Sequence, residues 1–530
     1  MAGSHPKAHT GDNNSGSTAA EPSPNTKSSP NTSIDIGGTS VRLSMHLHSA
    51  SIASTQESTL PNPCKVLVVG DSITQGHEGD HTWRYRLWQW LRSNAASHDF
   101  TFVGPYTGTD PPPVPMPPQP PRLGSDEPEK PEDSESRVKT DGKYAADVPA
   151  DFQGNHFSGW GWQLGQAKGM IRDVVNAYKP DVVLTLLGFN DIGWGFCEAS
   201  EVLNRMRDFI QEARAAEPDI TLLAGNIPQR RYMNGRQDLL ENTNEYNQQL
   251  PRLLDAMRSD SSPLHAVKVA QCYSCTPDGC PAGYDGLHPN VLGEFEIARA
   301  FSLTLHECFG IGTKALEVPS PRDMPQRPSH VPTNVFATGA PMGVTVTWDA
   351  VFGARGYDVR NRMRGKDRWE VARAQSNRFD TTFTVAGVAW EYQVRTNNGD
   401  GDNDKSDWSP VSTAVARRDT APPPQNIQTF SKDHGIQVTW SPVEGGSEVD
   451  RYAVTVLDQD TPGAIIICYG FRGTEATLQG LRNGHCYSVF VGTWAFVGGV
   501  SVGGLPAQAS SVTPGVLMED SRSHDMASLD

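Results

Sequence analysis

The sequence has 530 residues, of which 37% are hydrophobic and 20% are charged, and at about 100–200 residues per domain this length predicts two to four domains. Acidic residues outnumber basic ones by 61 to 45, which gives a net charge of −16 and disfavours binding to nucleic acid or to an anionic membrane surface. The sequence contains no apolar run long enough to predict a membrane span.

The two ends of the sequence predict disordered segments. Residues 1–60 are rich in Ser, Thr, Pro, Asn and Gly, a composition that cannot bury enough apolar surface to offset the entropy of ordering. Residues 516–530 form a predicted disordered tail. The first residues, MAGSHPKAHTGDNNSG, contain no apolar segment typical of a secretory signal, so the sequence by itself leaves the compartment open.

Residues 61–313 predict an α/β domain, because apolar strands alternate with helical patterns. Strands of a parallel sheet are buried on both faces, so they read as continuous apolar runs. The predicted strands are 65–69, 100–103, 181–187, 220–224 and 266–270. The predicted helices are 84–91, 201–216, 239–257 and 291–308, and the third of these is expected to bend or break at Pro251.

Residues 105–150 interrupt this alternation as an insertion of low complexity. They contain the run PPPVPMPPQPP and the acidic run DEPEKPEDSES. This composition is typical of a solvated surface loop with polyproline character. A binding role as a proline-rich ligand is the alternative.

The C-terminal part begins after a proline-rich linker at 314–330 and has a hydrophobic period of two. Predicted strands at 343–348, 356–359 and 390–394 recur in the same order about 90 residues later, at 435–440, 451–455 and 486–490. This repeat predicts two β-sandwiches, at 331–418 and 421–515. Each repeat has an early Trp, and Leu481 precedes Tyr487 at tyrosine-corner spacing. On these residues the C-terminal part resembles a pair of fibronectin type III domains, which implies a spacer or a module that contacts protein or glycan.

Two blocks of the α/β domain carry groups suited to nucleophilic catalysis. In GDSITQG (70–76), Ser72 follows a buried strand and precedes a helix, whose free N–H groups can stabilise a developing oxyanion. In DGLHPN, Asp285 and His288 are three residues apart at a predicted helix start, where they can share one face. A carboxylate beside an imidazole fixes its tautomer and stabilises its charged form. A plain structural turn is the alternative for the first block.

Two further blocks supply candidate oxyanion donors. Asn190, in GFND, follows the strand 181–187 and places an uncharged amide at a strand carboxyl end, where α/β sheets bind ligands; a helix cap is its alternative. Gly159, in SGWGW, permits a close approach of the backbone.

The four blocks together resemble those of the SGNH/GDSL hydrolase superfamily, and they are most similar to its carbohydrate esterase branch, which includes acetyl xylan esterases. The resemblance covers residues 64–312 and implies a flavodoxin-like α/β/α sandwich with a parallel sheet. It also implies that Ser72 is the nucleophile, that His288 is the general base and that Asp285 orients it. The implied oxyanion hole consists of the backbone N–H groups of Ser72 and Gly159 and the side chain of Asn190. Neither a metal nor an organic cofactor is implied.

Aromatic and basic residues near the blocks are candidates for substrate contact. Aromatic faces can stack on sugar rings, although Trp is often simply buried. The four candidates are Trp83, Trp160, Trp162 and Trp194. Arg230 and Arg231 could contact an acidic sugar or lie in a solvated loop.

The cysteines allow two interpretations. Cys272, Cys275 and Cys280, with His288, have some character of a zinc site, but their spacing fits no strong template. One disulfide within 272–280 is the simpler prediction. A bridge between Cys468 and Cys486 in the second sandwich is also possible by sequence.

The sequence therefore predicts a serine esterase that hydrolyses O-acyl esters, acetyl esters first of all, on carbohydrate or another small substrate. Glycan or protein contact through the fibronectin-like domains is expected, and the resemblance to secreted esterases implies an extracellular location. Two alternatives stay open: a lipid esterase or lysophospholipase of the same superfamily, and a catalytically dead binding or adhesion protein. The complete set of site residues argues against the last.

Overall fold

The structure of the protein is a computed structural model that describes residues 59–95, 97–124, 138–195, 197–461 and 466–515. The predicted tail, and all but the last two residues of the predicted N-terminal arm, lie outside these ranges. The same holds for residues 125–137 of the insertion.

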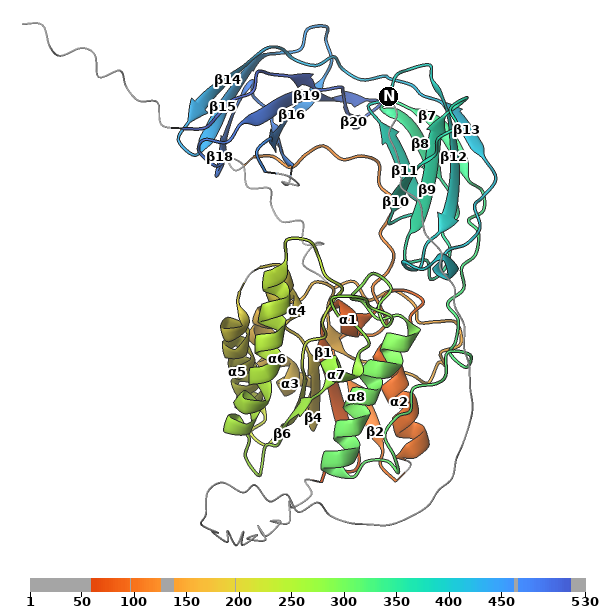
Figure 1. The fold of residues 1–530 in the computed structure, drawn as a ribbon, viewed down its shortest axis with the longest axis vertical. Coiled ribbons are helices and arrows are strands. Elements are labelled where there is room, and N and C mark those ends of the chain that lie inside the picture. The colour runs from red at the N-terminus through yellow and green to blue at the C-terminus, as the bar shows by residue number, and fades with distance from the viewer. Residues whose placement is uncertain (1–58, 96, 125–137, 196, 462–465, 516–530) are drawn as a thin grey trace, which may run out of the picture. The chain divides into compact units, whose positions relative to one another are not determined.

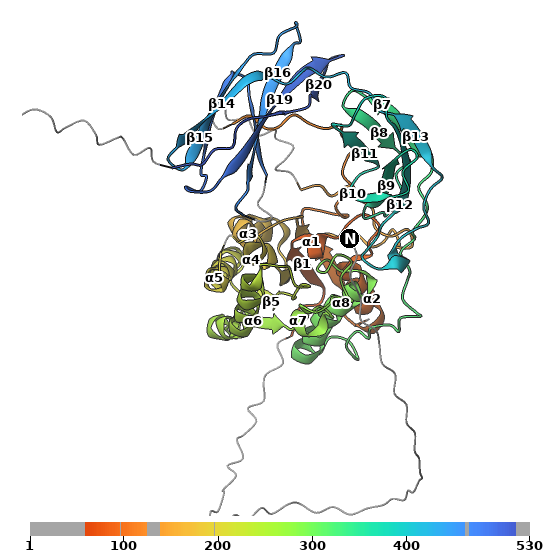
Figure 2. The same cartoon turned by 45° about the horizontal axis from the view of Figure 1, so that its top comes forward.

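The N-terminal domain is a parallel sheet between two layers of helices (Figures 1 and 2). The strands lie in the order β2-β1-β4-β5-β6, and β3 pairs with the end of β1. Their bounds are β1 Cys64–Gly70, β2 Phe100–Val103, β3 Phe157–Ser158, β4 Val182–Leu186, β5 Thr221–Gly225 and β6 Leu264–Val267. Strands β1, β4 and β5 are almost entirely buried, as their continuous apolar sequences require.

The helices divide between the two faces of the sheet. Helices α2 and α8 pack together on one face, and α3, α5 and α6 cover the other (Figure 1). The helices are α1 Ser72–Gln75, α2 Thr82–Asn94, α3 Leu164–Tyr178, α4 Phe189–Gly193, α5 Ala199–Ala216, α6 Gln237–Met257, α7 Val269–Cys272 and α8 Val291–Phe309. Helix α6 runs without a break through Pro251, so of the predicted bend or break, the break does not occur. Its buried face, which includes Tyr246, Leu250 and Leu254, compensates for the backbone hydrogen bond that proline cannot donate.

The strand order fixes where a site can form. Strand β1 has β2 on one side and β4 on the other, so the chain reverses its direction of winding between β1 and β4. In open α/β sheets, the carboxyl ends of the strands at such a switch point border the ligand crevice. Ser72 follows β1 and Asn190 follows β4, so both lie at this point.

The insertion is more structured than its composition predicts. Thr109 and Gly142 exchange two backbone hydrogen bonds of 3.0 and 3.1 Å, which close its base. The Gln75 side chain donates to the carbonyl of Lys139 at 2.6 Å, and Gly124 N donates to Gly470 O at 2.9 Å. The prediction of a solvated loop is therefore wrong for these segments, because the fold supplies backbone partners that composition does not reveal. The stretch between Pro111 and Pro118 is mostly exposed.

Residues beyond the linker form two antiparallel β-sandwiches, each with a three-stranded sheet packed on a larger one. The first contains β7 Phe336–Ala340, β8 Gly343–Thr347, β9 Tyr357–Met363, β10 Glu370–Ala374, β11 Arg378–Thr382, β12 Ala389–Thr396 and β13 Ser412–Val415. The second contains β14 Gln425–Lys432, β15 Gly435–Ser441, β16 Val449–Asp458, β17 Ile467–Phe471, β18 Glu475–Gln479, β19 Tyr487–Val497, β20 Val500–Gly503 and β21 Ala507–Gln508. The predicted core residues Trp348 and Trp440 are buried. The Tyr487 hydroxyl accepts a hydrogen bond from Arg482 N at 3.0 Å, which completes the predicted tyrosine corner.

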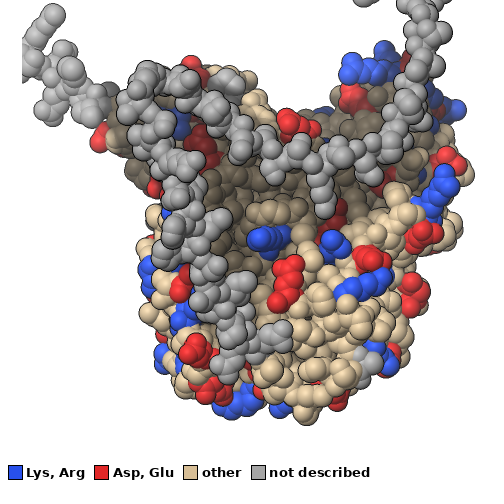
Figure 3. All heavy atoms as spheres, turned by 60° about the horizontal axis from the view of Figure 1, so that its bottom comes forward, with Lys and Arg blue, Asp and Glu red and all other residues tan. Residues whose placement is uncertain are grey.

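The surface carries charges of both signs. Acidic and basic side chains are interspersed over the face that Figure 3 shows. Within the described part of the chain, no helix combines the length and the apolar character needed to cross a membrane.

Candidate active site

Ser72 lies at the turn between β1 and α1. Asp71 begins the helix, and its side chain accepts a hydrogen bond from Ile73 N at 2.9 Å. Burial raises the pKa of Asp71 to about 7. Gly70 is required at this turn, because a Cβ there would come within 2.1 Å of Thr74 Oγ1. These contacts fix the turn, and Ser72 is only 6% exposed.

Ser72, His288 and Asp285 form one continuous set of hydrogen bonds. Ser72 Oγ lies 2.9 Å from His288 Nε2, and His288 Nδ1 lies 2.8 Å from Asp285 Oδ2. The other carboxylate oxygen of Asp285 accepts from the backbone N–H groups of Leu287 and His288. Burial raises the pKa of Asp285, but these hydrogen bonds and the His288 charge outweigh it, so the pKa of Asp285 is well below its usual value. The carboxylate is thus ionised and held in place by its own loop.

Asp285 and His288 lie in the loop that leads into α8, at the predicted helix start. His288 precedes Pro289, and a residue before proline is disfavoured in helical conformation. Asn290 caps α8 instead, through a hydrogen bond from Gly293 N to its side chain at 3.2 Å. The Asp285 and His288 side chains meet because Asp285 accepts hydrogen bonds from the N–H groups of Leu287 and His288, which close the turn between them.

The predicted oxyanion donors lie at the switch point with Ser72. Asn190, in α4, donates one amide hydrogen to the carbonyl of Trp162 at 2.9 Å, which leaves its second amide hydrogen for a ligand. The N–H of Gly159 makes a long hydrogen bond of 3.3 Å to Gly70 O. Gly159 must be glycine, since a Cβ would come within 2.5 Å of the Trp162 ring.

Two of the four predicted tryptophans are available to a substrate. Trp160 is 41% exposed and stacks on the His288 imidazole, with 5.0 Å between ring centroids and an angle of 14° between planes. Trp194 is 57% exposed and lies against Gly161. Trp160 thus presents aromatic surface beside the triad, and Trp194 presents it beside the loop that carries Trp160.

The other two tryptophans belong to the core. Trp83 is fully buried and stacks on Phe301 at 4.7 Å, so the prediction that it contacts substrate is wrong. Helix α2 directs the Trp83 side chain toward α8, and the closeness of Trp83 to Ser72 in the sequence does not reveal this direction. Trp162 is half-buried and packs edge-on against Phe157 at 4.9 Å, so it supports Gly159 and offers little free surface.

Arginines at the site have distinct roles. Arg231 forms an ion pair with Asp400 at 2.7 Å. Arg230 is half-buried near Asp285, and burial lowers its pKa. Arg84 is fully buried, and its guanidinium donates to the carbonyls of Thr74 and Gln75 at 2.9 and 3.0 Å. The sequence gives no sign of this role, because an arginine within a predicted helix is usually exposed.

Gln75 is a second residue that sequence analysis missed. Its side-chain oxygen accepts from Trp160 N at 2.7 Å, while its amide holds Lys139 of the insertion. It therefore connects the nucleophile turn, the aromatic loop and the insertion. Its position within GDSITQG, three residues after Ser72, is the feature of the sequence that could have identified Gln75 as part of the site.

The cysteines do not form the zinc set. Cys275 and Cys280 form a disulfide, in agreement with the simpler prediction, and Cys272 is free. Cys468 and Cys486 are also free. Cys468 lies on β17 and Cys486 directly before β19, with β16 between these strands, and this separation exceeds the reach of a disulfide.

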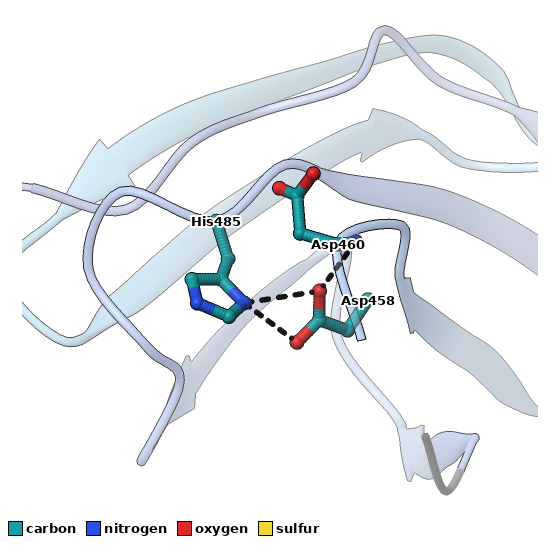
Figure 4. Close-up of side chains that lie close together, drawn as sticks. All are labelled: Asp458, Asp460 and His485. Atoms are coloured by element: carbon teal, nitrogen blue, oxygen red, sulfur yellow. Dashed lines mark hydrogen bonds and ion pairs between the residues drawn. The ribbon is translucent and has the colours of Figure 1, made fainter. Parts of the chain in front are cut away.

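One other group among the described residues has metal-ligating side chains close together: Asp458, Asp460 and His485 of the second sandwich (Figure 4). His485 Nδ1 lies 3.0 Å from Asp458 Oδ2, and Asp460 accepts from Cys486 N at 2.7 Å. These hydrogen bonds join the turn after β16 to the segment before β19 and account for the cluster.

Two family models match the sequence. Residues 66–301 match the model described as GDSL-like lipase/acylhydrolase, and residues 422–500 match that of the fibronectin type III domain. The chain therefore carries an ester-hydrolase domain followed by fibronectin type III structure.

Solved structures similar to this chain include three esterases. A mutant acetyl esterase with an acetate ion is 23% identical, with 44% of this chain and 92% of that chain covered and a TM-score of 0.33. A carbohydrate esterase of family 3 from Talaromyces cellulolyticus is 22% identical, with coverage of 45% and 94% and a TM-score of 0.32. A family 3 carbohydrate esterase from Clostridium thermocellum is 20% identical, with the same coverage and TM-score.

Proposed function

We propose that the acylhydrolase domain removes O-acetyl groups from carbohydrate, with Ser72 as nucleophile, His288 as general base and Asp285 as the carboxylate that orients it. The observation that carries this proposal is the unbroken set of contacts from Ser72 Oγ to His288 Nε2 and from His288 Nδ1 to Asp285 Oδ2, at 2.9 and 2.8 Å. Both distances are within hydrogen-bond reach of an activated nucleophile.

The reaction proceeds in two acyl-transfer steps. With the Nδ1 proton of His288 donated to Asp285, Nε2 is free to accept the Ser72 proton as Oγ attacks the ester carbonyl. The protonated imidazole then donates this proton to the departing sugar hydroxyl, which leaves an acetyl-enzyme. Water attacks the acetyl-enzyme as His288 accepts one of its protons. The imidazolium then donates this proton to Ser72 Oγ as the intermediate collapses, which releases acetate and restores the free serine.

The oxyanion of each tetrahedral intermediate requires hydrogen-bond donors. Asn190 retains a free amide hydrogen, and the backbone N–H of Ser72 lies at the first residue of α1, directly after β1. The Gly159 N–H would exchange its long bond of 3.3 Å to Gly70 O for one to the oxyanion. Donors fixed in advance stabilise developing charge without reorganisation. Trp160 and Trp194 supply exposed aromatic faces for a sugar ring.

An acyl-chain series tests this function. The purified chain should hydrolyse p-nitrophenyl acetate faster than the octanoate, and should release acetate from acetylated xylo-oligosaccharides. A fluorophosphonate probe should label Ser72, since it requires the same activated oxygen. Faster hydrolysis of the octanoate would favour a lipid esterase, and an inactive, unlabelled chain would favour a binding protein.

Replacement of Asn190 by alanine should lower kcat by about 10²- to 10³-fold, the usual cost of one oxyanion donor. Because the interaction forms in the transition state, kcat and kcat/KM should fall together while KM changes little. Asn204→Ala, at an exposed position of α5, is the matched control and should retain full activity. A rise in KM with unchanged kcat would instead assign Asn190 to ground-state binding.

A further inference from the structure

The first β-sandwich meets the α/β domain through glycine backbones. Gly79 follows the nucleophile helix, and a Cβ at this residue would come within 2.6 Å of Gly353 Cα in the sandwich. Both residues have positive φ angles, of 83° and 75°, which favour glycine. The described residues of both parts belong to one compact unit. A side chain at Gly79 would therefore push the two surfaces apart, whereas a Cβ at Gly353 would make ordinary contact, 3.6 Å from Gly79 Cα.

A buried ion cluster lies beside this contact. Asp80 accepts from Arg327 of the linker and, at 2.7 Å, from Arg355 of the sandwich, and the side chains of Asp80 and Arg355 are 5% and 4% exposed. The two arginines hold the pKa of Asp80 below its usual value although burial raises it. Displacement of Arg355 from Asp80 would leave buried charge without its partner, which is costly. The ion cluster therefore holds the Arg355 guanidinium in place.

Arg355 also contacts the loop that carries His288. Its guanidinium lies 3.8 Å from the centroid of the Tyr284 ring, and it donates to Pro289 O at 3.3 Å. Tyr284 stacks on the His288 imidazole with centroids 5.7 Å apart and an angle of 21°. Tyr284 O also accepts a hydrogen bond from Asp400 N of the sandwich at 3.1 Å.

The imidazole of His288 therefore has two aromatic neighbours in near-parallel stacking. Trp160 is at 5.0 Å and Tyr284 at 5.7 Å. Ser72 and Asp285 fix the ring by hydrogen bonds within its plane, and stacking resists tilt out of that plane. The Tyr284 contact is the one that Arg355 supports.

On the premise of the proposed function, we propose that Arg355 of the first β-sandwich is a positioning residue of the esterase, which acts on His288 through Tyr284. The sandwich is then a working part of the catalytic unit, beyond the spacer or binding role that its fold implies. A small displacement of a catalytic group strongly reduces rate, since the imidazole must face Ser72 Oγ, the leaving oxygen and water in turn.

Arg355→Met in the full chain tests the proposal, because it removes the charge and retains most of the side-chain length. With p-nitrophenyl acetate as substrate, kcat should fall by roughly 10- to 100-fold with little change in KM. Arg360→Met is the matched control, because the Arg360 guanidinium likewise lies over aromatic rings of the sandwich, 4.5 Å from that of Trp408 and 4.9 Å from that of Trp369. This control should retain wild-type kcat.

A second variant guards against misfolding of the first. Tyr284→Leu leaves the Asp80 ion cluster intact and should also lower kcat, and Arg355→Met added to it should cause little further loss, because both act through one ring. Tryptophan fluorescence and thermal unfolding identify the temperature range in which each variant is folded, and rates are compared within that range.

The outcomes separate cleanly. Folded Arg355→Met with kcat within twofold of wild type overturns the proposal, as does full additivity of the two substitutions. A loss of thermal stability with unchanged kcat assigns Arg355 a purely structural role and also overturns it. Failure of the proposed function would appear differently, as a wild-type chain without esterase activity.

Discussion

Ser72→Ala should abolish esterase activity, with kcat reduced by about 10⁴- to 10⁶-fold, because the acyl-enzyme cannot form without Oγ. The residual rate would come from the oxyanion donors and substrate binding alone. Under the proposed function substrate should still bind, because the substitution leaves the exposed rings of Trp160 and Trp194 unchanged. Initial rates on p-nitrophenyl acetate, together with loss of fluorophosphonate labelling, measure the effect.

The control for this substitution is Ser93→Ala on α2, where the hydroxyl bonds only to backbone carbonyls of its own helix and to the neighbouring Asn94. It should keep wild-type activity and labelling. Ser72 is nearly buried, so circular dichroism and thermal unfolding should establish that the Ser72→Ala variant is folded. A folded variant that remains active would exclude Ser72 as the nucleophile.

Asp285→Asn should lower kcat by about 10⁴-fold while the fold is retained. The asparagine amide would donate toward His288 Nδ1, which forces the imidazole into the tautomer that carries its proton on Nε2. This nitrogen then cannot accept the proton of Ser72. The asparagine oxygen can still accept the N–H groups of Leu287 and His288, at 3.1 and 2.8 Å in the wild type, so the loop should keep its shape.

Asp278→Asn is the matched control, since Asp278 is exposed in the loop that precedes the triad. Its activity should equal that of the wild type across the pH range.

The pKa of Asp285 lies well below its usual value, so its carboxylate stays ionised as the pH falls from neutral. Loss of activity at acid pH should therefore arise from the protonation of other groups. Equal activity of Asp285→Asn and wild type would remove Asp285 from the mechanism.

Both predictions concern residues that the sequence identified, and the reason is local. GDSITQG and GFND follow strands whose apolar runs are continuous because the sheet buries both faces. A motif that follows such a strand is placed by the strand, so the sequence alone assigns Ser72 and Asn190 to the same edge of the sheet. Asp285 and His288 are three residues apart in one short loop, so their contact can likewise be expected from the local sequence.

The pattern of helices is only partly predictable from the sequence. Helix α3 was missed although Leu164, Ala167, Ile171 and Val174 recur at helical spacing and are buried. Its glycines, at 165 and 169, weaken the local helical signal. The helix also continues through Pro251, where a bend or a break was predicted, because the packing of α6 against the domain outweighs one missing hydrogen bond.

The sequence by itself determined most of the order of elements and the two kinds of domain, since both depend on patterns of residues a few positions apart. It also identified the blocks that carry the candidate triad, although Ser72 and His288 are 216 positions apart. Tertiary structure decided which of the four tryptophans reach the surface, which cysteines pair and where the insertion packs. It also decided that Arg355 lies over Tyr284, although 71 positions separate them in the sequence. Such contacts depend on how whole domains meet, and the periodicity of a single segment carries no information about that.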